Sequence, residues 1–345
     1  MNGPLWVVGG EQKLTFLHQK EWNQFRAAVV MRVDPQAPPE SALKRVLEYE
    51  SPPEHCPDDG GSHVFKAATL DGDTMWLCTQ TEVLECGFPG FDIRRVISLP
   101  CFNDLHHVTP GPDGTLFVAV TGLDAVAEVS LDGELLRLVD VLGGDVWDRF
   151  DRSVDYRKVP TTKPHRSHPN YVFFLDGQPW VTRFEQRDAV PINPSRSGGR
   201  PPFAVAIAGI HDGNLVGGPA GDRLLFTSVD GHLVRFDLST GERRDLDLNS
   251  IMEPDDDRPL GWCRGVQSED GDTAWVGFSR LRRTKLRQNL SWVRHGFREG
   301  YFHKRQPTRI ALYDIERSAR LQEIDLEPAG LNAVFSIHRS LHRGD

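Results

Sequence analysis

The chain has 345 residues, 39% of them hydrophobic, and a formal charge of −9 at pH 7. A chain of this size buries a sizeable core without disulfides or structural metals. The acidic balance argues against a general nucleic-acid binder, which presents a basic surface to phosphates, and no apolar run reaches the roughly 18 residues needed to span a membrane.

Two further features predict a cytoplasmic protein. The N-terminal run MNGPLWVVGGEQK lacks a basic region followed by an apolar one, so it does not resemble a secretory signal. The cysteines are odd in number, form no CxxC pair and lie mostly in apolar runs, which is typical of reduced thiols. They are Cys56, Cys78, Cys86, Cys101 and Cys263.

Apolar runs separated by turn signals follow one another along the chain, and a 3.6-residue period is almost nowhere sustained, which predicts an all-β protein. The N-terminal runs are PLWVVGG, KLTFLHQ, RAAVVMRV and LKRVLEYE. Five similar segments follow, each with a short strand, an Asp-Gly or Gly-Asp turn and a second apolar strand. They begin at His63, His107, His168, His211 and Arg264.

Further strands follow each segment, for example EVLECG and RRVISLP, which gives about four strands per unit at intervals of 43 to 68 residues. Antiparallel units of this kind are typical of propeller blades. A sixth blade forms if the C-terminal run LNAVFSIHRS joins the N-terminal runs, which closes the ring and removes its open edge. We expect a single β-propeller domain over residues 1–345 with six blades; five blades with an added N-terminal sheet are the alternative.

The first strand of each blade lines the central channel, so the residues that open the units are expected to face one axis. They are His63, His107, His168, His211, Arg264 and Asn332. An even number of residues separates four of them from the Asp of the next turn, which places these side chains on one face of their strands. The longer turn after His211 leaves its phase open.

Four histidines from four rigid strands predict a divalent transition metal centre, with Fe or Zn as the ion. The metal ligands are then His63, His107, His168 and His211. The alternative is a polar, water-filled channel without metal. Because neighbouring residues on a strand point in opposite directions, His106 replaces His107 if it is the member of the pair that faces the axis.

Arg264 is expected to clamp an anionic group of a small-molecule substrate. A structural pair with a channel carboxylate such as Asp104 or Asp212 is the alternative. Asn332, by its position, and Arg183 complete the predicted set of catalytic residues.

Two segments are longer than a blade requires and are expected to cover the axial site, at about residues 142–167 and 280–309. Their aromatic residues predict the walls of a pocket; they are Trp147, Phe150, Tyr156, Trp292, Phe297, Tyr301 and Phe302. The second insertion has ten Lys and Arg residues against a single acid, Glu299, which favours an anionic ligand. A docking patch for nucleic acid or protein is the alternative. A third loop, QRDAVPINPSRSGGRPP, is not assigned to either end of the ring.

The repeat pattern resembles the six-bladed propellers that include gluconolactonase-like hydrolases, the peptidyl-hydroxyglycine lyase domain and arylsulfate sulfotransferases. The run HPNYVFFLDGQPWVTR is similar to a sulfotransferase motif, which implies roles for His168, Asn170 and Arg183. The sulfotransferase resemblance implies a histidine that accepts the transferred group, and the lyase resemblance implies zinc bound by histidines from different blades.

Three functions follow. The first is a metal-dependent oxygenase, lyase or hydrolase. The second is a metal-free enzyme in which a channel histidine acts as nucleophile or general base. The third is a propeller that binds a protein or small ligand without catalysis. The sequence does not determine the substrate or the oligomeric state.

Overall fold

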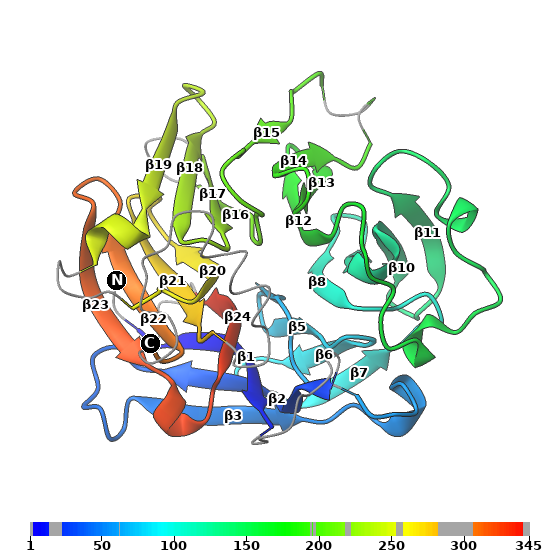
Figure 1. Cartoon of the computed structure of the whole chain (residues 1–345), viewed down its shortest axis with the longest axis horizontal. Helices are drawn as coiled ribbons and strands as arrows, with labels where there is room; N and C mark the ends of the chain where they lie inside the picture. Colours follow the sequence, from blue (N-terminus) through cyan, green and yellow to red (C-terminus); the bar gives the residue numbers. More distant parts are fainter. Residues whose placement is uncertain are drawn as a thin grey trace.

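The computed structural model describes residues 3–13, 23–61, 63–193, 195, 198–217, 222–252, 258–281 and 306–340. These residues form six four-stranded antiparallel sheets arranged around one axis, which is the predicted six-bladed propeller (Figure 1). Among the helices of this part of the chain, none is long and apolar enough to cross a membrane.

The strands of each blade are given from the axis outward. They are β24 (Ala333–His338), β1 (Leu5–Gln12), β2 (Phe25–Val33) and β3 (Leu43–Tyr49); β4 (Ala68–Asp71), β5 (Thr74–Cys78), β6 (Val83–Gly87) and β7 (Ile93–Ile97); β8 (Leu105–Pro110), β9 (Thr115–Val120), β10 (Ala125–Ser130) and β11 (Leu135–Asp140); β12 (Pro169–Leu175), β13 (Gln178–Arg183), β14 (Asp188–Pro191) and β15 (Phe203–Ala204); β16 (Asn214–Val216), β17 (Arg223–Ser228), β18 (His232–Asp237) and β19 (Arg243–Asp247); β20 (Trp262–Ser268), β21 (Thr273–Ser279), β22 (Arg309–Asp314) and β23 (Ala319–Asp325).

Short 3-10 turns join some of these strands. They are η2 (Pro53–His55), η3 (Thr121–Leu123), η4 (Val146–Asp148), η5 (Tyr156–Lys158), η7 (Leu248–Ile251) and η8 (Glu327–Ala329).

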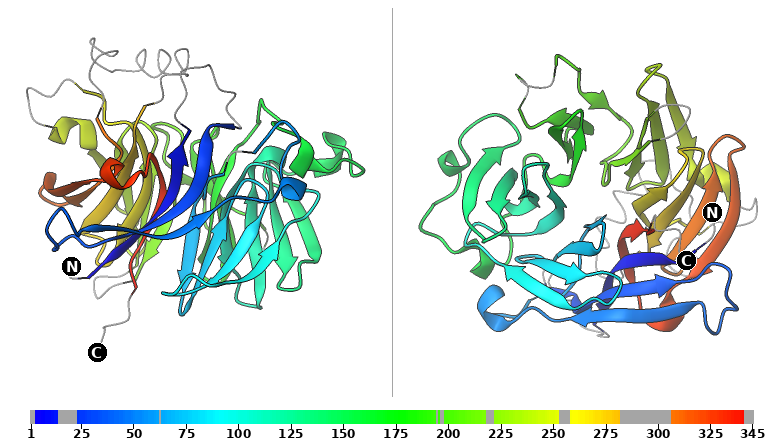
Figure 2. Two further views of the ribbon diagram at one scale, coloured as in Figure 1. Left: turned by 90° about the horizontal axis from the view of Figure 1, so that it is seen from below. Right: turned by 180° about the vertical axis from the view of Figure 1, so that it is seen from behind.

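The ring closes where the two ends of the chain meet in one blade. Strands β24 and β1 lie side by side in one blade (Figure 2). They pair antiparallel, so Trp6 lies opposite His338 and Gly10 lies opposite Ala333. This pairing confirms the predicted closure of the ring. Of the N-terminal runs, KLTFLHQ lies mostly outside the described residues.

Hydrophobic cores lie between neighbouring blades, because each sheet packs on both faces. Trp275 of β21 packs with residues of the first blade, and Trp76 of β5 packs with residues of the third. Burial on both faces explains why many strands, such as β9 and β21, are almost continuously apolar in sequence.

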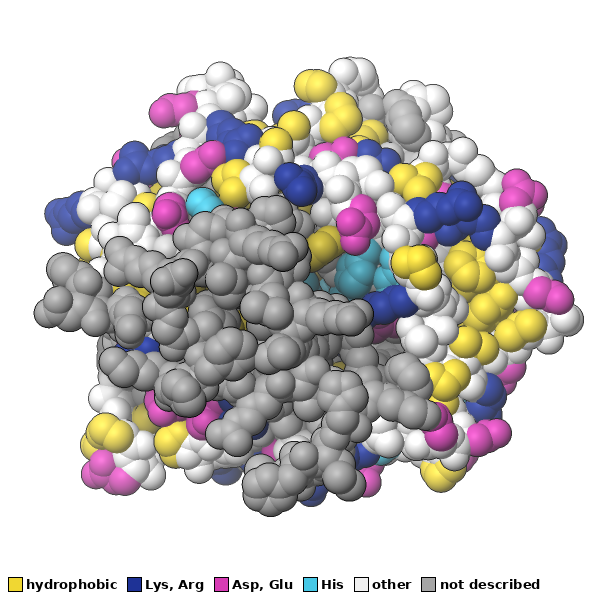
Figure 3. Space-filling view, in the orientation of Figure 1, with side chains coloured by type: hydrophobic (Ala, Val, Ile, Leu, Met, Phe, Trp, Pro, Cys, Tyr) yellow, Lys and Arg dark blue, Asp and Glu magenta, His cyan; other side chains and the backbone are white. Residues whose placement is uncertain are grey.

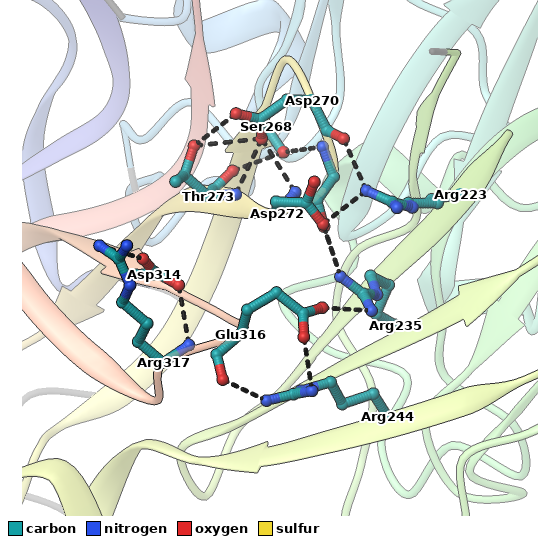
Figure 4. A network of polar contacts seen from close by, with 11 residues as sticks. Arg223, Arg235, Arg244, Ser268, Asp270, Asp272, Thr273, Asp314, Glu316 and Arg317 are labelled. Atoms are coloured by element: carbon teal, nitrogen blue, oxygen red, sulfur yellow. Dashed lines mark hydrogen bonds and ion pairs between the residues drawn. The ribbon is translucent and has the colours of Figure 1, made fainter. Parts of the chain in front are cut away.

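Ion pairs connect the outer parts of the fifth and sixth blades (Figure 4). Arg235 on β18 bonds Asp272 at 3.0 Å and Glu316 at 2.7 Å. Arg223 reaches the same Asp272 at 2.6 Å, and Arg244 reaches the same Glu316 at 2.7 Å. Two carboxylates shared by three arginines hold these blades in register.

Register shifts interrupt four inner strands, β8, β12, β20 and β24, near the end at which they begin. At each shift one or two residues have no partner on the neighbouring strand, and such bulges redirect side chains. The residues are His106, Asn170, Tyr171, Arg264, Gly265 and Phe335. Gly277 faces the β20 bulge, where a Cβ atom would collide with the carbonyl oxygen of Arg264.

The first predicted insertion, residues 142–167, packs over the second and third blades. Lys158 donates to the carbonyl oxygens of Pro53 and Cys56, at 2.8 and 2.9 Å. The aromatic residues of this segment pack into the core between the two blades instead of forming the walls of a pocket; they are Trp147, Phe150 and Tyr156.

The second insertion lies outside the described residues over 282–305, and so do its predicted pocket residues; these are Trp292, Phe297, Tyr301 and Phe302. The third loop, between β14 and β15, lies at the opposite end of the ring from the beginnings of the inner strands. There Gly198 and Arg200 line a cavity of about 440 Å³ together with Leu175 and Trp180.

Candidate active site on the propeller axis

Polar and charged side chains gather at the end of the ring where the inner strands begin. Figure 3 shows histidine side chains near the middle of this face, beside Lys or Arg side chains. The blades supply Lys66, Asp104, His106, His168, His211 and Arg264, and the apolar Phe335 lies among them.

The orientation of His211 is fixed by a carboxylate. Its Nδ1 lies 3.0 Å from Asp212 Oδ1, so this nitrogen carries the proton and donates it to the carboxylate. Asp212 is held in turn by the backbone N–H of Gly265 at 2.7 Å and by the hydroxyl of Thr227. The unprotonated Nε2 is buried and has no hydrogen-bond partner among the described residues.

His106 belongs to a chain of hydrogen bonds that fixes its tautomer as well. The Asn170 amide donates to Ile210 O at 2.9 Å, so its oxygen accepts the Nδ1–H of His106 at 2.5 Å. His106 Nε2 therefore accepts a hydrogen bond from Lys66 Nζ at 3.3 Å. Lys66 also lies 3.3 Å from Asp104 Oδ1.

The phenyl ring of Phe335 lies between two cations and His211. Lys66 Nζ is 5.0 Å from the ring centroid and Arg264 Cζ is 4.8 Å from it. The His211 ring lies 6.0 Å away, centroid to centroid. The ring therefore lies near two positive charges, and that of Lys66 is paired with the carboxylate of Asp104.

His168 lies at the start of β12 with a left-handed backbone, φ 58°. Its backbone N–H and those of Arg166 and Ser167 donate to Asp124 at 2.8 to 2.9 Å, which fixes the end of the first insertion. The His168 ring lies 4.9 Å from that of His106, centroid to centroid, and its Nδ1 lies 3.1 Å from His165 Nδ1.

Burial keeps the axial histidines neutral. It lowers the pKa of His106 to about 3, with the charge of Lys66 as the second cause. Burial also lowers the pKa of His168 well below its usual value, and it lowers the pKa of His211 although Asp212 opposes it. Each of these rings is therefore uncharged at neutral pH.

His107 lies on the axial side too, but its nitrogens are occupied. Nδ1 accepts the backbone N–H of Val172 at 3.1 Å, and Nε2 lies 3.0 Å from the hydroxyl of Thr69. Its ring stacks on Tyr171 with centroids 3.7 Å apart. Of His106 and His107, it is His106 that lies beside His168 and His211. This is the alternative to His107 considered from the sequence.

Three other predicted site residues lie away from this group. The Nδ1 of His63 accepts the backbone N–H of Ser51 at 3.0 Å, and Lys66 takes the axial position of its blade. Arg183 forms a bidentate pair with Asp188, at 2.8 and 2.6 Å. Asn332 accepts the N–H of Gln12 at 3.0 Å and so contributes to ring closure.

The axial residues do not fit the predicted Fe or Zn centre. Within the described ranges, no three His, Cys, Asp or Glu side chains are arranged to hold a metal ion. Both nitrogens of His106 and of His107 already have partners, and the amine of Lys66 lies where a cation would approach His106.

Several residues of the site were not predicted as functional from the sequence. Lys66 follows His63 by three positions, and Asp212 is adjacent to His211. The His-Asp dipeptide was a usable signal, because a carboxylate beside a histidine is the usual way to fix its tautomer. Phe335 gave no signal, since it lies in an ordinary apolar strand.

No protein-family model and no curated protein matches the chain. Among solved structures it is similar to a protein of unknown function from Bacteroides caccae, with 12% identity, 97% of each chain covered and a TM-score of 0.57. A structure of the nidogen/laminin complex is similar at 10% identity, with 97% of each chain covered and a TM-score of 0.55. Streptogramin B lyase matches at 13% identity over 94% of this chain and 88% of its own, with a TM-score of 0.49. At such identities these likenesses concern the fold alone.

Proposed function

We propose that the protein is an enzyme that binds a small anionic substrate on the propeller axis and removes a proton from it with His211. One observation carries the proposal. The Nε2 of His211 is buried without a partner among the described residues, while Asp212 holds the opposite nitrogen in its protonated form. A carboxylate that fixes the tautomer of a neutral imidazole is the arrangement of a histidine general base.

The charges around the base favour a carbon acid as substrate. Removing a proton from a carbon beside a carboxylate or carbonyl group places new negative charge next to the group that was bound. Arg264 and Lys66, which both lie close to the Phe335 ring, are in position to hold the first charge and to stabilise the second. This is the metal-free, histidine-based chemistry that the sequence offered as its second function.

The experiment uses solvent exchange, because it detects proton abstraction before the natural substrate is known. The protein is incubated in D₂O with a panel of small 2-oxo and 2-hydroxy carboxylates, and loss of C–H signals is followed by proton NMR. We expect exchange above the rate without protein for at least one compound. His211→Gln should reduce the exchange by about 100-fold or more, which is the usual contribution of a general base.

His232→Gln is the matched control. His232 on β18 also lies 3.0 Å from a carboxylate, Asp230, but away from the axial group. The His232→Gln variant should exchange the substrate's protons at the wild-type rate. Equal exchange rates for His211→Gln and the wild-type protein, or no exchange with any compound of the panel, would contradict the proposal.

A further inference from the structure

The amine of Lys66 lies within the axial group, and its surroundings differ from those of a surface lysine. The residue is 9% exposed, and its Nζ lies 3.3 Å from both His106 Nε2 and Asp104 Oδ1. The His106 tautomer is fixed by Asn170, so Nε2 offers a lone pair to this amine. Both neighbours therefore accept hydrogen bonds from Lys66 and fix the position of its amine.

The same lysine is desolvated and lies near a second cation. Burial lowers its pKa, the carboxylate of Asp104 opposes this, and Arg264 adds to the lowering. Burial and a neighbouring positive charge are the two conditions that make a lysine amine nucleophilic toward carbonyl carbon.

We propose that Lys66 forms an imine with the carbonyl group of a 2-oxo acid whose carboxylate is bound by Arg264. This inference rests on the proposed function, since it places the substrate at the same site, and it narrows the substrate class to 2-oxo acids. The ring of Phe335 provides an apolar surface for the carbon chain between the two groups.

The step balances without a further reactant. The ammonium of Lys66 loses one proton to solvent water, and the neutral amine adds to the ketone carbon while the C=O π electrons move to oxygen. The oxygen takes two protons in all and leaves as water, and one proton stays on the iminium nitrogen. The iminium then accepts the electron pair of the adjacent C–H bond when His211 Nε2 takes that proton, which yields an enamine.

Reductive trapping tests the inference. The full-length protein is incubated with pyruvate and sodium borohydride, which converts an imine to a stable secondary amine, and the modified peptide is located by mass spectrometry. We expect one adduct per chain, on Lys66. Peptide mapping of the wild-type protein gives this answer even if a Lys66 variant folds poorly.

Two variants complete the test. Lys66→Arg keeps the positive charge but cannot form an imine, so its adduct should fall to the level of exposed lysines. Lys44→Arg, at an exposed position on β3, should leave the adduct unchanged. If pyruvate exchanges its protons in D₂O but no adduct forms on Lys66, the imine is overturned while the proposed function stands. Adducts spread equally over surface lysines, or equal adducts in wild type and Lys66→Arg, overturn the inference as well.

Discussion

Acidification from pH 7.5 to 5 should strongly destabilise the protein. Its buried histidines are neutral in the folded state, and protonation favours the unfolded chain. The clearest case is His107, which is 1% exposed and whose Nδ1 accepts a backbone N–H from Val172. Burial lowers its pKa to about 3, against a usual value of 6.5. A proton on this ring would break that hydrogen bond and leave a charge in the core.

The sign follows from the two pKa values. Between pH 6.5 and 3 the unfolded chain binds a proton at this histidine and the folded protein does not, so stability falls as the pH falls. The slope is about 1.4 kcal/mol per pH unit for one such group, or about 2 kcal/mol lost at pH 5. Burial also lowers the pKa of His106 to about 3 and that of His338 to about 4. Together these three histidines lower the free energy of unfolding by about 6 kcal/mol at pH 5, which is comparable to the whole stability of many domains.

The assay is urea unfolding at intervals between pH 7.5 and 5. In this range depressed carboxyl pKa values contribute little, since those groups titrate lower. His232 acts in the opposite sense because its pKa is raised, and His232→Gln should make the slope steeper. His107→Gln should lower stability at pH 7.5 and reduce the slope by about 1.4 kcal/mol per pH unit. A free energy of unfolding that is flat between pH 6.5 and 5, or an unchanged slope in His107→Gln, would refute the reasoning.

Four further outcomes are expected. Asp212→Asn should slow proton exchange in D₂O by about 100-fold with little change in fold, because it releases the tautomer of His211; wild-type exchange in this variant would argue against the pair. Gly277→Ala should lower the free energy of unfolding, measured in urea, by about 3 kcal/mol, because the added methyl group would contact the backbone at the β20 bulge. An unchanged free energy would mean that the bulge rearranges at little cost. Arg235→Met should lower the free energy of unfolding by about 2 kcal/mol, because it removes the ion pairs with Asp272 and Glu316 between two blades. Equal thermal midpoints for this variant and the wild-type protein would show that the network is dispensable. EDTA should leave exchange unchanged, whereas loss of exchange that Fe or Zn restores would favour the metal centre predicted from the sequence.

The architecture was predictable because it depends on features repeated along the chain. Turn dipeptides between apolar runs gave the blades, and the terminal runs gave the closing sheet through β24 and β1. These features are local, and the regular geometry of a blade determines how they combine.

The axial site was predictable only in part. His168, His211 and Arg264 lie in the expected region, since their segments open inner strands. Counting alternate residues failed at His63 and favoured His107 over its neighbour, because bulges and a late strand start change which side chain faces the axis. No local pattern in the sequence announces these shifts.

The contacts that give the site its chemistry were beyond prediction for a different reason. The hydrogen bond from His106 to Asn170 joins residues 64 positions apart, and that from Gly265 to Asp212 joins residues 53 apart. Such pairs are set by packing of blades against one another, so they emerge only once the ring is assembled.

The tautomer of His211 is the most direct test of the account, and it can be measured by nitrogen-15 NMR on protein labelled at histidine. We expect a neutral ring at pH 7 with the proton on Nδ1, an Nε2 resonance without a proton, and a change in that resonance when pyruvate is added. His211→Gln assigns the signal. A proton on Nε2, or a ring that is protonated at pH 7, would contradict the role of His211 as the base.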